Sequence, residues 1–262
     1  MTGSRVSDYT WAVRYPSPSF FNDIRIVRFN AMNIQGLQKL TLLDYPGHTA
    51  CTVFTGGCNL RCPFCHNAPL VLDPDGNPPF TEEEIFALLE KRRGILDGVA
   101  VTGGEPLLQK DIGAFLKKVK DRGFAVKLDT NGFFPDRLEA LLKDGLADYV
   151  AMDIKNRPEK YALTCGLEDV DLNKIEKSVR LLTDSGVDYE FRTTVVKEFH
   201  GIEDIEAAAK WIAGAKRYYL QAFKDSGALI AGGCTGCSPE EMHEMADRAR
   251  PYVALCEVRG VE

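Results

Sequence analysis

Short apolar runs alternate with longer amphipathic runs along the chain from about residue 49. The short runs are rich in β-branched and aromatic residues, whereas the longer runs space their apolar residues as one face of a helix does. Six strands are predicted, over Thr49–Thr55, Gly98–Thr102, Ala125–Asp129, Tyr149–Ile154, Tyr189–Val196 and Arg217–Phe223. Six helices are predicted, over Glu82–Arg93, Asp111–Arg122, Pro135–Asp144, Leu172–Ser185, Glu203–Ala213 and Pro239–Arg250.

This alternation predicts a parallel sheet with right-handed crossovers. The run Tyr149–Met152 is continuously apolar, as expected when both faces of a strand are covered. Six units are two short of a closed barrel, so the pattern predicts an α/β fold, an incomplete (βα)6 parallel barrel. Tyr252–Val258 is expected to add an edge strand. In such folds the reactive residues lie at the carboxyl ends of the strands.

The first 31 residues differ from the rest of the chain. They contain Pro16, Pro18 and aromatic residues without a period, so residues 1–31 are predicted to be a loosely packed extension, in one interpretation an over-long gene start. The barrel domain is expected over residues 32–262. Within it, Thr81 before three glutamates predicts a capped helix start.

Composition and charge exclude several classes of protein. With 45% apolar and 27% charged residues the chain is not intrinsically disordered. A net charge of −6 with interspersed signs gives no electrostatic footprint for nucleic acid or an anionic membrane. No run reaches the roughly 18 apolar residues of a membrane span, and the N-terminus lacks the apolar core of a secretory signal. A cytoplasmic protein is expected.

Three of the eight cysteines form the segment Cys58-Asn-Leu-Arg-Cys62-Pro-Phe-Cys65, directly after the first predicted strand. Thiolates are soft ligands that suit iron–sulfur clusters and zinc. Three thiolates on a four-iron cluster leave one iron open for a substrate or cofactor. The alternative from spacing alone is a zinc knuckle that borrows Cys234, Cys237 or His66.

Other strand ends also carry polar groups. One of them is the segment Thr102-Gly103-Gly104-Glu105-Pro106. Its two glycines allow the backbone to approach a ligand closely, and its carboxylate can accept hydrogen bonds from an ammonium group. Taken alone, the segment also fits an ordinary turn. The runs Lys127–Gly132 and Met152–Lys155 end the next two strands. Alternation places their Asp and Lys side chains inside the barrel, where they need partners or ligands; a lattice of salt bridges is the alternative.

Two further polar residues lie in the last strands. Arg192 within an apolar strand needs an acidic partner, and its planar guanidinium suits a carboxylate. A ligand carboxylate and a barrel aspartate both remain open as that partner. Gln221 ends the last predicted unit, where it could meet an adenine or a substrate peptide.

The cysteine segment and the Gly-Gly-Glu-Pro turn together resemble the radical S-adenosylmethionine (SAM) superfamily, over most of residues 34–261. The resemblance implies that Cys58, Cys62 and Cys65 bind a 4Fe–4S cluster, and that SAM chelates the open iron. One electron from the cluster would cleave SAM to a 5′-deoxyadenosyl radical. The resemblance implies SAM contacts from Gly103, Gly104, Glu105, Asp129, Thr130, Asn131, Asp153, Arg192 and Gln221.

The runs Asp129-Thr-Asn-Gly132 and Asp153-Ile-Lys155 resemble the activases of glycyl-radical enzymes. In that family the aspartates lie near the SAM carboxylate and are associated with a monovalent cation. The resemblance therefore implies a cation at Asp129, Thr130 and Asp153, and it assigns Lys155 and Asp129 as the catalytic residues.

The run Gln38–Gly47, the segment Cys65-His66-Asn67 and the ending Glu257–Val261 resemble anaerobic ribonucleoside-triphosphate reductase activating proteins. The resemblance implies a radical SAM oxidoreductase that removes a glycine α-hydrogen from a partner reductase, with flavodoxin or ferredoxin as the electron donor. His66 is expected to donate a hydrogen bond near the cluster rather than to bind iron.

Three alternatives remain open on the sequence. Two keep the chemistry: an activase of another glycyl-radical enzyme, and a peptide-modifying radical SAM enzyme. The third is a zinc-stabilised binding module without catalysis. The pair Cys234 and Cys237 lies outside the family pattern and is open to interpretation as a surface thiol pair, a metal-ligand pair or a redox pair.

Overall fold

Eight strands form one sheet in chain order, β1 to β8, in the computed structural model, which describes residues 32–76, 79–225 and 227–261. The extension expected over residues 1–31 lies outside the described residues. The strands are β1 (Ile34–Thr41), β2 (Ala50–Thr55), β3 (Gly98–Gly103), β4 (Ala125–Thr130), β5 (Tyr149–Asp153), β6 (Asp188–Val195), β7 (Tyr218–Ala222) and β8 (Cys256–Arg259).

Helices fill the crossovers between the parallel strands. They are α1 (Ala68–Leu72), α2 (Glu82–Lys91), α3 (Ile112–Lys120), α4 (Pro135–Lys143), α5 (Tyr161–Cys165), α6 (Leu172–Asp184), α7 (Ile202–Trp211) and α8 (Pro239–Ala249). Single turns of 3₁₀ helix lie at Pro106–Leu108, Pro158–Lys160 and Arg250–Tyr252. In the described part of the chain, no helix combines the length and the apolar character needed to cross a membrane.

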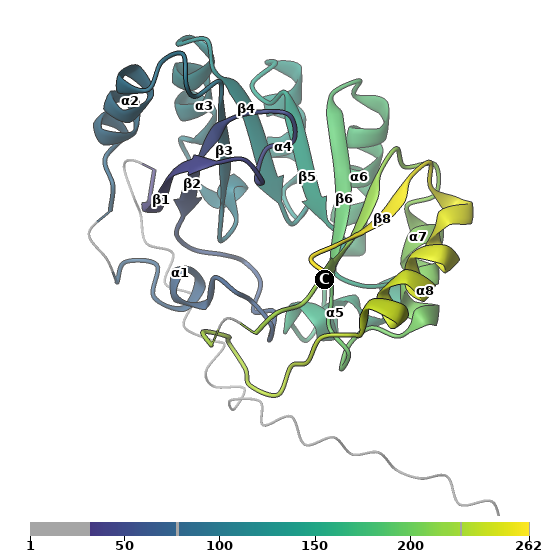
Figure 1. Cartoon of the computed structure of the whole chain (residues 1–262). Coiled ribbons are helices and arrows are strands. Elements are labelled where there is room, and N and C mark those ends of the chain that lie inside the picture. Colours follow the sequence, from purple (N-terminus) through teal and green to yellow (C-terminus); the bar gives the residue numbers. More distant parts are fainter. Residues whose placement is uncertain (1–31, 77–78, 226, 262) are drawn as a thin grey trace, which may run out of the picture.

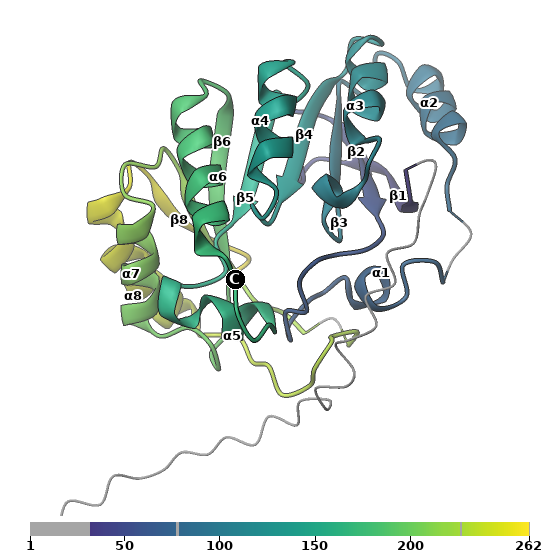
Figure 2. The same ribbon diagram turned by 180° about the vertical axis from the view of Figure 1, so that it is seen from behind.

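The sheet is an incomplete barrel, as the sequence predicts. Strands β2 to β8 are parallel neighbours, and β1 pairs antiparallel with β2. In the described residues β1 and β8 are the two sheet edges and do not pair with each other, so the barrel stays open. The larger helices lie on the outer side of the curved sheet (Figures 1 and 2).

Alternate side chains of each parallel strand lie on opposite faces of the sheet. In β4, Val126 and Leu128 are fully buried in the main core, which the outer helices share. Lys127 and Asp129 point to the opposite face, inside the barrel. Burial of each large apolar side chain stabilises the fold by roughly 1.5–3 kcal/mol, so the outer face holds the sheet to its helices. The opposite face carries a smaller apolar cluster of Tyr45, Ala50, Tyr149 and Ala151, together with polar groups such as Lys127 and Asp129.

The structure also adds elements that the periodicity does not predict. Strand β1, α1 and α5 are absent from the sequence-based elements, whereas β8 corresponds to the edge strand expected near Tyr252–Val258. The helix start at Thr81 is confirmed: its hydroxyl accepts from the Glu84 N–H, and the Glu84 carboxylate accepts from the Thr81 N–H. The predicted six strands correspond to β2 through β7.

Candidate active site

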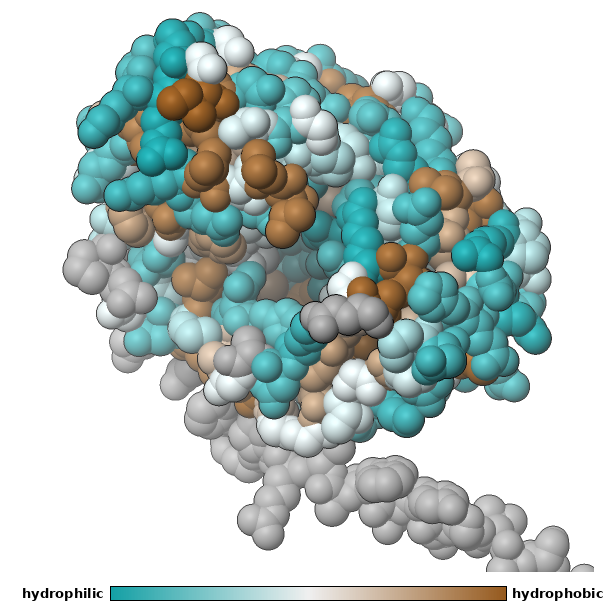
Figure 3. Space-filling model, in the orientation of Figure 1, coloured by the Kyte–Doolittle hydropathy of each residue, from teal (hydrophilic) through white to brown (hydrophobic). Residues whose placement is uncertain are grey.

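A cavity of about 210 Å³ lies at the carboxyl ends of the strands. The face of the molecule shown in Figure 3 is hollowed in its middle, at this end of the sheet. Every residue that the sequence analysis assigns to the cluster or to SAM, except Glu105, lines the cavity. They are Cys58, Cys62, Cys65, Gly103, Gly104, Asp129, Thr130, Asn131, Asp153, Lys155, Arg192 and Gln221. The sequence therefore located the residues that the fold brings together here.

The three cysteines lie on the loop between β2 and α1, and their thiols are free. The Arg61 guanidinium holds the loop in shape by donating to the carbonyl oxygens of Cys58 and Leu60, at 2.8 and 2.7 Å. Burial raises the pKa of the Cys58 thiol to about 12. A hydrogen bond from Cys165 lowers the pKa of Cys62 to about 7, against the effect of burial. Cys62 is therefore the thiol of the three that ionises most readily.

The two glycines of the Gly-Gly-Glu-Pro turn allow other backbone segments of the same chain to approach them closely. A Cβ on Gly103, whose φ is +117°, would overlap the backbone of Thr55, and one on Gly104 would overlap the carbonyl oxygen of Gly57. The Gly104 N–H donates to the Thr55 carbonyl at 2.8 Å. These contacts fix the end of β3 against the start of the cysteine loop.

Glu105 departs from the expectation that its carboxylate meets a ligand ammonium group. The side chain is fully buried and does not line the cavity as the structure describes it. Its Oε1 accepts from the Leu107 N–H and the Thr130 hydroxyl, both at 2.9 Å, and its Oε2 accepts from the Asn131 N–H at 2.7 Å. Burial raises the pKa of Glu105 to about 7. Its bonds hold the turn after β4 to β3.

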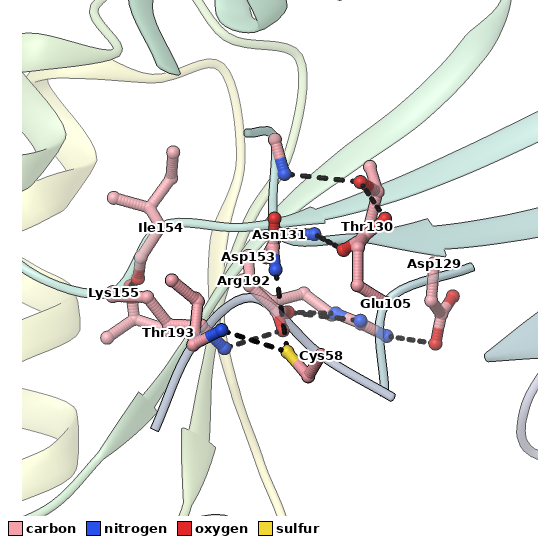
Figure 4. A network of polar contacts seen from close by, with 12 residues as sticks. Cys58, Glu105, Asp129, Thr130, Asn131, Asp153, Ile154, Lys155, Arg192 and Thr193 are labelled. Carbon is pink, nitrogen blue, oxygen red and sulfur yellow. Dashed lines mark hydrogen bonds and ion pairs between the residues drawn. The ribbon is translucent and has the colours of Figure 1, made fainter. Parts of the chain in front are cut away.

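Asn131 joins that turn to the cysteine loop. Its Nδ2 donates to Asn59 Oδ1 at 2.8 Å and contacts the Cys58 sulfur at 3.8 Å (Figure 4). Asn67, at the other end of the loop, donates to the Gly103 carbonyl at 2.7 Å. The sequence marks Asn67 only as part of the Cys-His-Asn run and gives no sign of this contact.

Arg192 lies between two carboxylates inside the barrel (Figure 4). Its guanidinium is 3.3 Å from Asp129 Oδ2 and 3.0 Å from Asp153 Oδ1. Lys155 reaches Asp153 Oδ2 at 2.9 Å, and Lys127 pairs with Asp129. Each carboxylate is thus shared by two cations of the chain itself.

These ion pairs set the charge state of the cavity wall. Burial alone would raise the pKa of Asp153, but Lys155 and Arg192 lower it to about 2. Arg192 and Lys127 likewise lower the pKa of Asp129 against the effect of burial. The same pairs raise the pKa of Lys155 and of Arg192. Both carboxylates and both cations are therefore charged at neutral pH.

The arrangement does not fit the monovalent cation expected at Asp129, Thr130 and Asp153. The Thr130 hydroxyl donates to Glu105, and the Arg192 guanidinium takes the position between the two aspartates. We therefore assign no step to such a cation. Of the two partners left open for Arg192 by the sequence, the structure shows barrel aspartates.

His66, beside the third cysteine of the loop, also lines the cavity. The exposed His66 ring stacks on Phe223, with centroids 5.2 Å apart and an interplanar angle of 17°. Cys234 and Cys237 have free thiols on a loop held by Thr235, whose N–H and hydroxyl donate to Glu198 at 2.8 and 2.6 Å. Neither cysteine of this pair lines the cavity as described.

The donor set of the cavity fits a three-cysteine iron–sulfur cluster. Three soft thiols from one loop face it, and each would bind a different iron, so their sulfurs need not converge on one point. In residues 32–76, 79–225 and 227–261, no three His, Cys, Asp or Glu side chains have the arrangement of a single-ion site.

The chain belongs to the Radical SAM superfamily, whose family model matches residues 52–212. It is therefore an enzyme whose cofactors are a 4Fe–4S cluster and S-adenosylmethionine. A chain of Methanocaldococcus jannaschii that carries the name of a glycyl-radical enzyme activating enzyme is 37% identical over 234 residues, covering 87% of this chain and 96% of that one. The protein is an activating enzyme of the glycyl-radical type.

Other relatives and structures agree with this family. The pyruvate formate-lyase-activating enzyme of Clostridium pasteurianum is 28% identical, over 71% of this chain and 84% of that enzyme. The crystal structure of Streptococcus suis SuiB bound to S-adenosylmethionine has a TM-score of 0.62 at 15% identity, covering 78% of this chain. The chain spans 48% of the length of SuiB, and the likeness is one of fold. Because the chain belongs to an enzyme superfamily, the alternative of a zinc-stabilised binding module without catalysis is excluded.

Proposed function

We propose that this chain activates an anaerobic ribonucleotide reductase by removing an α-hydrogen from a glycine of that partner. The observation that carries the proposal is one loop that presents three thiols to a cavity whose other wall is the Asp129, Asp153 and Arg192 network. Sequence relatives named for glycyl-radical enzyme activation support the reaction class. The reductase as target rests on the Gln38–Gly47 run and the Glu257–Val261 ending.

Both of these segments are built into the barrel. Tyr45, from the first, is buried at the amino ends of the strands with its ring 6.1 Å from that of Tyr149. Arg259, from the second, donates to both carboxylate oxygens of the buried Glu190, at 2.9 and 3.0 Å. Tyr149 donates to the same carboxylate at 2.7 Å. The segments that favour a reductase activase therefore meet through Tyr149 and Glu190.

We assign Cys58, Cys62 and Cys65 as the cluster ligands. These thiolates would hold the cluster, which would supply the electron for SAM cleavage and so the radical chemistry that removes a hydrogen atom from glycine. Arg192 is suited to orient a ligand carboxylate because its guanidinium forms paired hydrogen bonds in one plane.

The remaining walls position ligands and exclude water. We assign Lys155 and Asp153 as charged contacts of bound SAM. We assign the backbone at Gly103 and Gly104 as a contact of the amino-acid part of SAM. Leu60 and Phe64, 2% and 5% exposed, line the cavity and keep solvent from the reacting groups. The substrate glycine would enter on a polypeptide loop at the open side of the barrel, where β1 and β8 are not paired with each other.

The proposal is tested by electron paramagnetic resonance of the reductase under anaerobic conditions. The reduced enzyme and SAM are mixed with the glycyl-radical reductase of the same organism, with flavodoxin or ferredoxin as the expected electron source. The expected result is the doublet of a glycyl radical on the reductase and none with Cys62→Ala.

A second mixture, in which a pyruvate formate-lyase replaces the reductase, distinguishes between the two candidate target enzymes. A doublet on the lyase but not on the reductase would move the target to another glycyl-radical enzyme. SAM cleavage without a doublet on either protein would favour a peptide-modifying enzyme.

A further inference from the structure

The side-chain amide of Asn131 contacts the first sulfur of the cysteine loop (Figure 4). Its Nδ2 lies 3.8 Å from the Cys58 Sγ and 2.8 Å from the Asn59 Oδ1. A primary amide has two N–H donors, and these two contacts take up one donor each. Asn131 is buried, and a buried amide needs such partners for its donors. Both donors of this amide are therefore directed at the cysteine loop.

The turn after β4 fixes the orientation of the amide. The Asn131 Oδ1 accepts from the Phe133 N–H at 3.1 Å, so the carbonyl end of the amide has its own partner and the NH2 end faces the loop. The Asn131 N–H donates to Glu105 Oε2 at 2.7 Å, which holds the backbone at the same point. The direction of the two side-chain donors is thus set by contacts outside the loop that they meet.

The Cys58 sulfur also has an N–H neighbour from its own loop. The Leu60 N–H donates to this sulfur at 3.4 Å. The Asn131 amide comes from a different strand end, 73 residues later in the chain. The environment of the Cys58 sulfur therefore depends on the barrel wall as well as on the loop.

We propose that Asn131 is a positioning residue for the cluster: its side-chain N–H donates a hydrogen bond to the Cys58 sulfur and raises the reduction potential of the bound cluster. The inference rests on the proposed role of Cys58 as a ligand. A ligating thiolate carries no proton, so its sulfur acts as an acceptor. An N–H donor beside a ligand sulfur offsets negative charge, and the reduced cluster, which carries one more electron, is stabilised by it more than the oxidised cluster.

This role differs from the SAM contact that the family resemblance implies for Asn131. The contacts with Asn59 and Cys58 leave no N–H of the amide for SAM. The consequence for function lies in the electron transfer that precedes SAM cleavage. In that step one electron passes from a flavodoxin- or ferredoxin-type donor to the cluster, and no bond forms or breaks. A higher potential of the cluster makes this transfer more favourable.

The test compares Asn131→Leu and Asn131→Asp with the unchanged enzyme, each loaded anaerobically with iron and sulfide. Both substitutions remove the N–H donors; the leucine adds no charge, and the aspartate keeps an acceptor for the Phe133 N–H. Asn59→Ala is the matched control, because it removes the other contact of the Asn131 amide and leaves Cys58 its donor. The readout is a redox titration without SAM, followed by electron paramagnetic resonance of the reduced cluster.

Both Asn131 variants should shift the midpoint to more negative potential, and the aspartate should shift it further because of its charge. Asn59→Ala should stay near the unchanged enzyme. A second readout is electron–nuclear double resonance of the reduced cluster in heavy water, which detects exchangeable hydrogens close to the cluster. The deuteron coupling should be weaker in both Asn131 variants and should be retained in Asn59→Ala.

Three results would overturn the inference. Equal midpoints in Asn131→Leu and the unchanged enzyme would remove the hydrogen bond as a cause. A shift in Asn59→Ala as large as that in Asn131→Leu would assign the effect to the anchoring of the loop. Loss of the cluster from both Asn131 variants would make the residue a structural support of the loop. A failure of the proposed function is distinct, because the unchanged enzyme would then load no cluster.

Discussion

Glu105 accepts a 2.9 Å hydrogen bond from the hydroxyl of Thr130, and both side chains are buried. The contact joins the turn after β3 to the end of β4. It turns the glutamate of the Gly-Gly-Glu-Pro segment into an internal support of the cavity wall. A carboxylate with three donors around it is costly to replace.

We expect Glu105→Gln to lower the free energy of unfolding by about 1–3 kcal/mol, because the amide NH2 group accepts no hydrogen bond, whereas a carboxyl group keeps acceptor capacity even when it is protonated. The folded pKa of Glu105 is about 7, against about 4.3 for an unperturbed glutamate. The folded chain thus binds the proton more tightly, so this stabilisation is complete below about pH 4 and is lost as the pH rises through 7. Urea unfolding should therefore give a larger loss for the variant at pH 5 than at pH 8.

The exposed Glu83 of α2 provides the control for this measurement. Glu83→Gln should change the free energy of unfolding by less than about 0.5 kcal/mol at either pH. Equal losses for Glu105→Gln at pH 5 and pH 8 would contradict the raised pKa.

Arg192→Met should destabilise the fold by about 1–3 kcal/mol, because two partly buried carboxylates each lose one of their two cations. The depressed pKa of Asp153, about 2, contributes stability above about pH 4 that is lost as the pH falls through 2. The difference between the unchanged enzyme and the variant should therefore shrink from pH 6 towards pH 2. Arg248→Met, which breaks an exposed pair with Glu206, should destabilise the fold much less, because solvent screens this pair. Similar losses in both variants would argue against a special role for Arg192.

Cys62→Ala should prevent cluster loading. We expect about four iron and four sulfide per chain in the unchanged enzyme after anaerobic reconstitution, and a large loss in the variant. Iron and sulfide assays with the visible absorption spectrum provide the measurement. Cys51→Ala should load normally, since Cys51 is a buried side chain of β2. Full loading of Cys62→Ala would exclude Cys62 as a ligand.

Gly166→Ala separates close packing from backbone strain. Gly166 and Gly186 both have positive φ, at +67° and +75°, but only a Cβ at Gly166 would meet another group, the Arg61 carbonyl. Gly186→Ala should cost about 1–2 kcal/mol from strain alone. Gly166→Ala should cost roughly 1–3 kcal/mol more and should reduce cluster loading as well. Unfolding curves and iron content measure both; equal effects would show that the contact with Arg61 does not matter.

Much of the fold could be predicted because hydrophobic period and element type agree along the parallel strands. Strand β1 could not, since Gln38 and Lys39 break the apolar run, and β1 is itself an edge strand that pairs antiparallel with β2. Helix α5 is five residues long, too short for a helical period to appear. Tertiary contacts, not propensity, form such elements.

The candidate site was largely predictable because strand ends converge in a barrel whatever their separation in sequence. Glu105 was predictable as a site residue but not in its orientation, because the backbone donors of Leu107 and Asn131 that surround it carry no sequence signature. The contact between Asn131 and Cys58 gave no signal, since the two residues belong to different motifs and lie far apart in the sequence.

The Arg192 guanidinium that joins two acids also determines how an anion enters the cavity. The guanidinium of Arg192 is already paired with Asp129 and Asp153. A ligand carboxylate that binds to Arg192 must therefore compete with these two aspartates for the same N–H donors. Binding of a ligand carboxylate then replaces one negative partner of Arg192 with another, inside a cavity that is largely shielded from solvent. Its strength should depend on geometry far more than on the ionic strength of the surrounding medium.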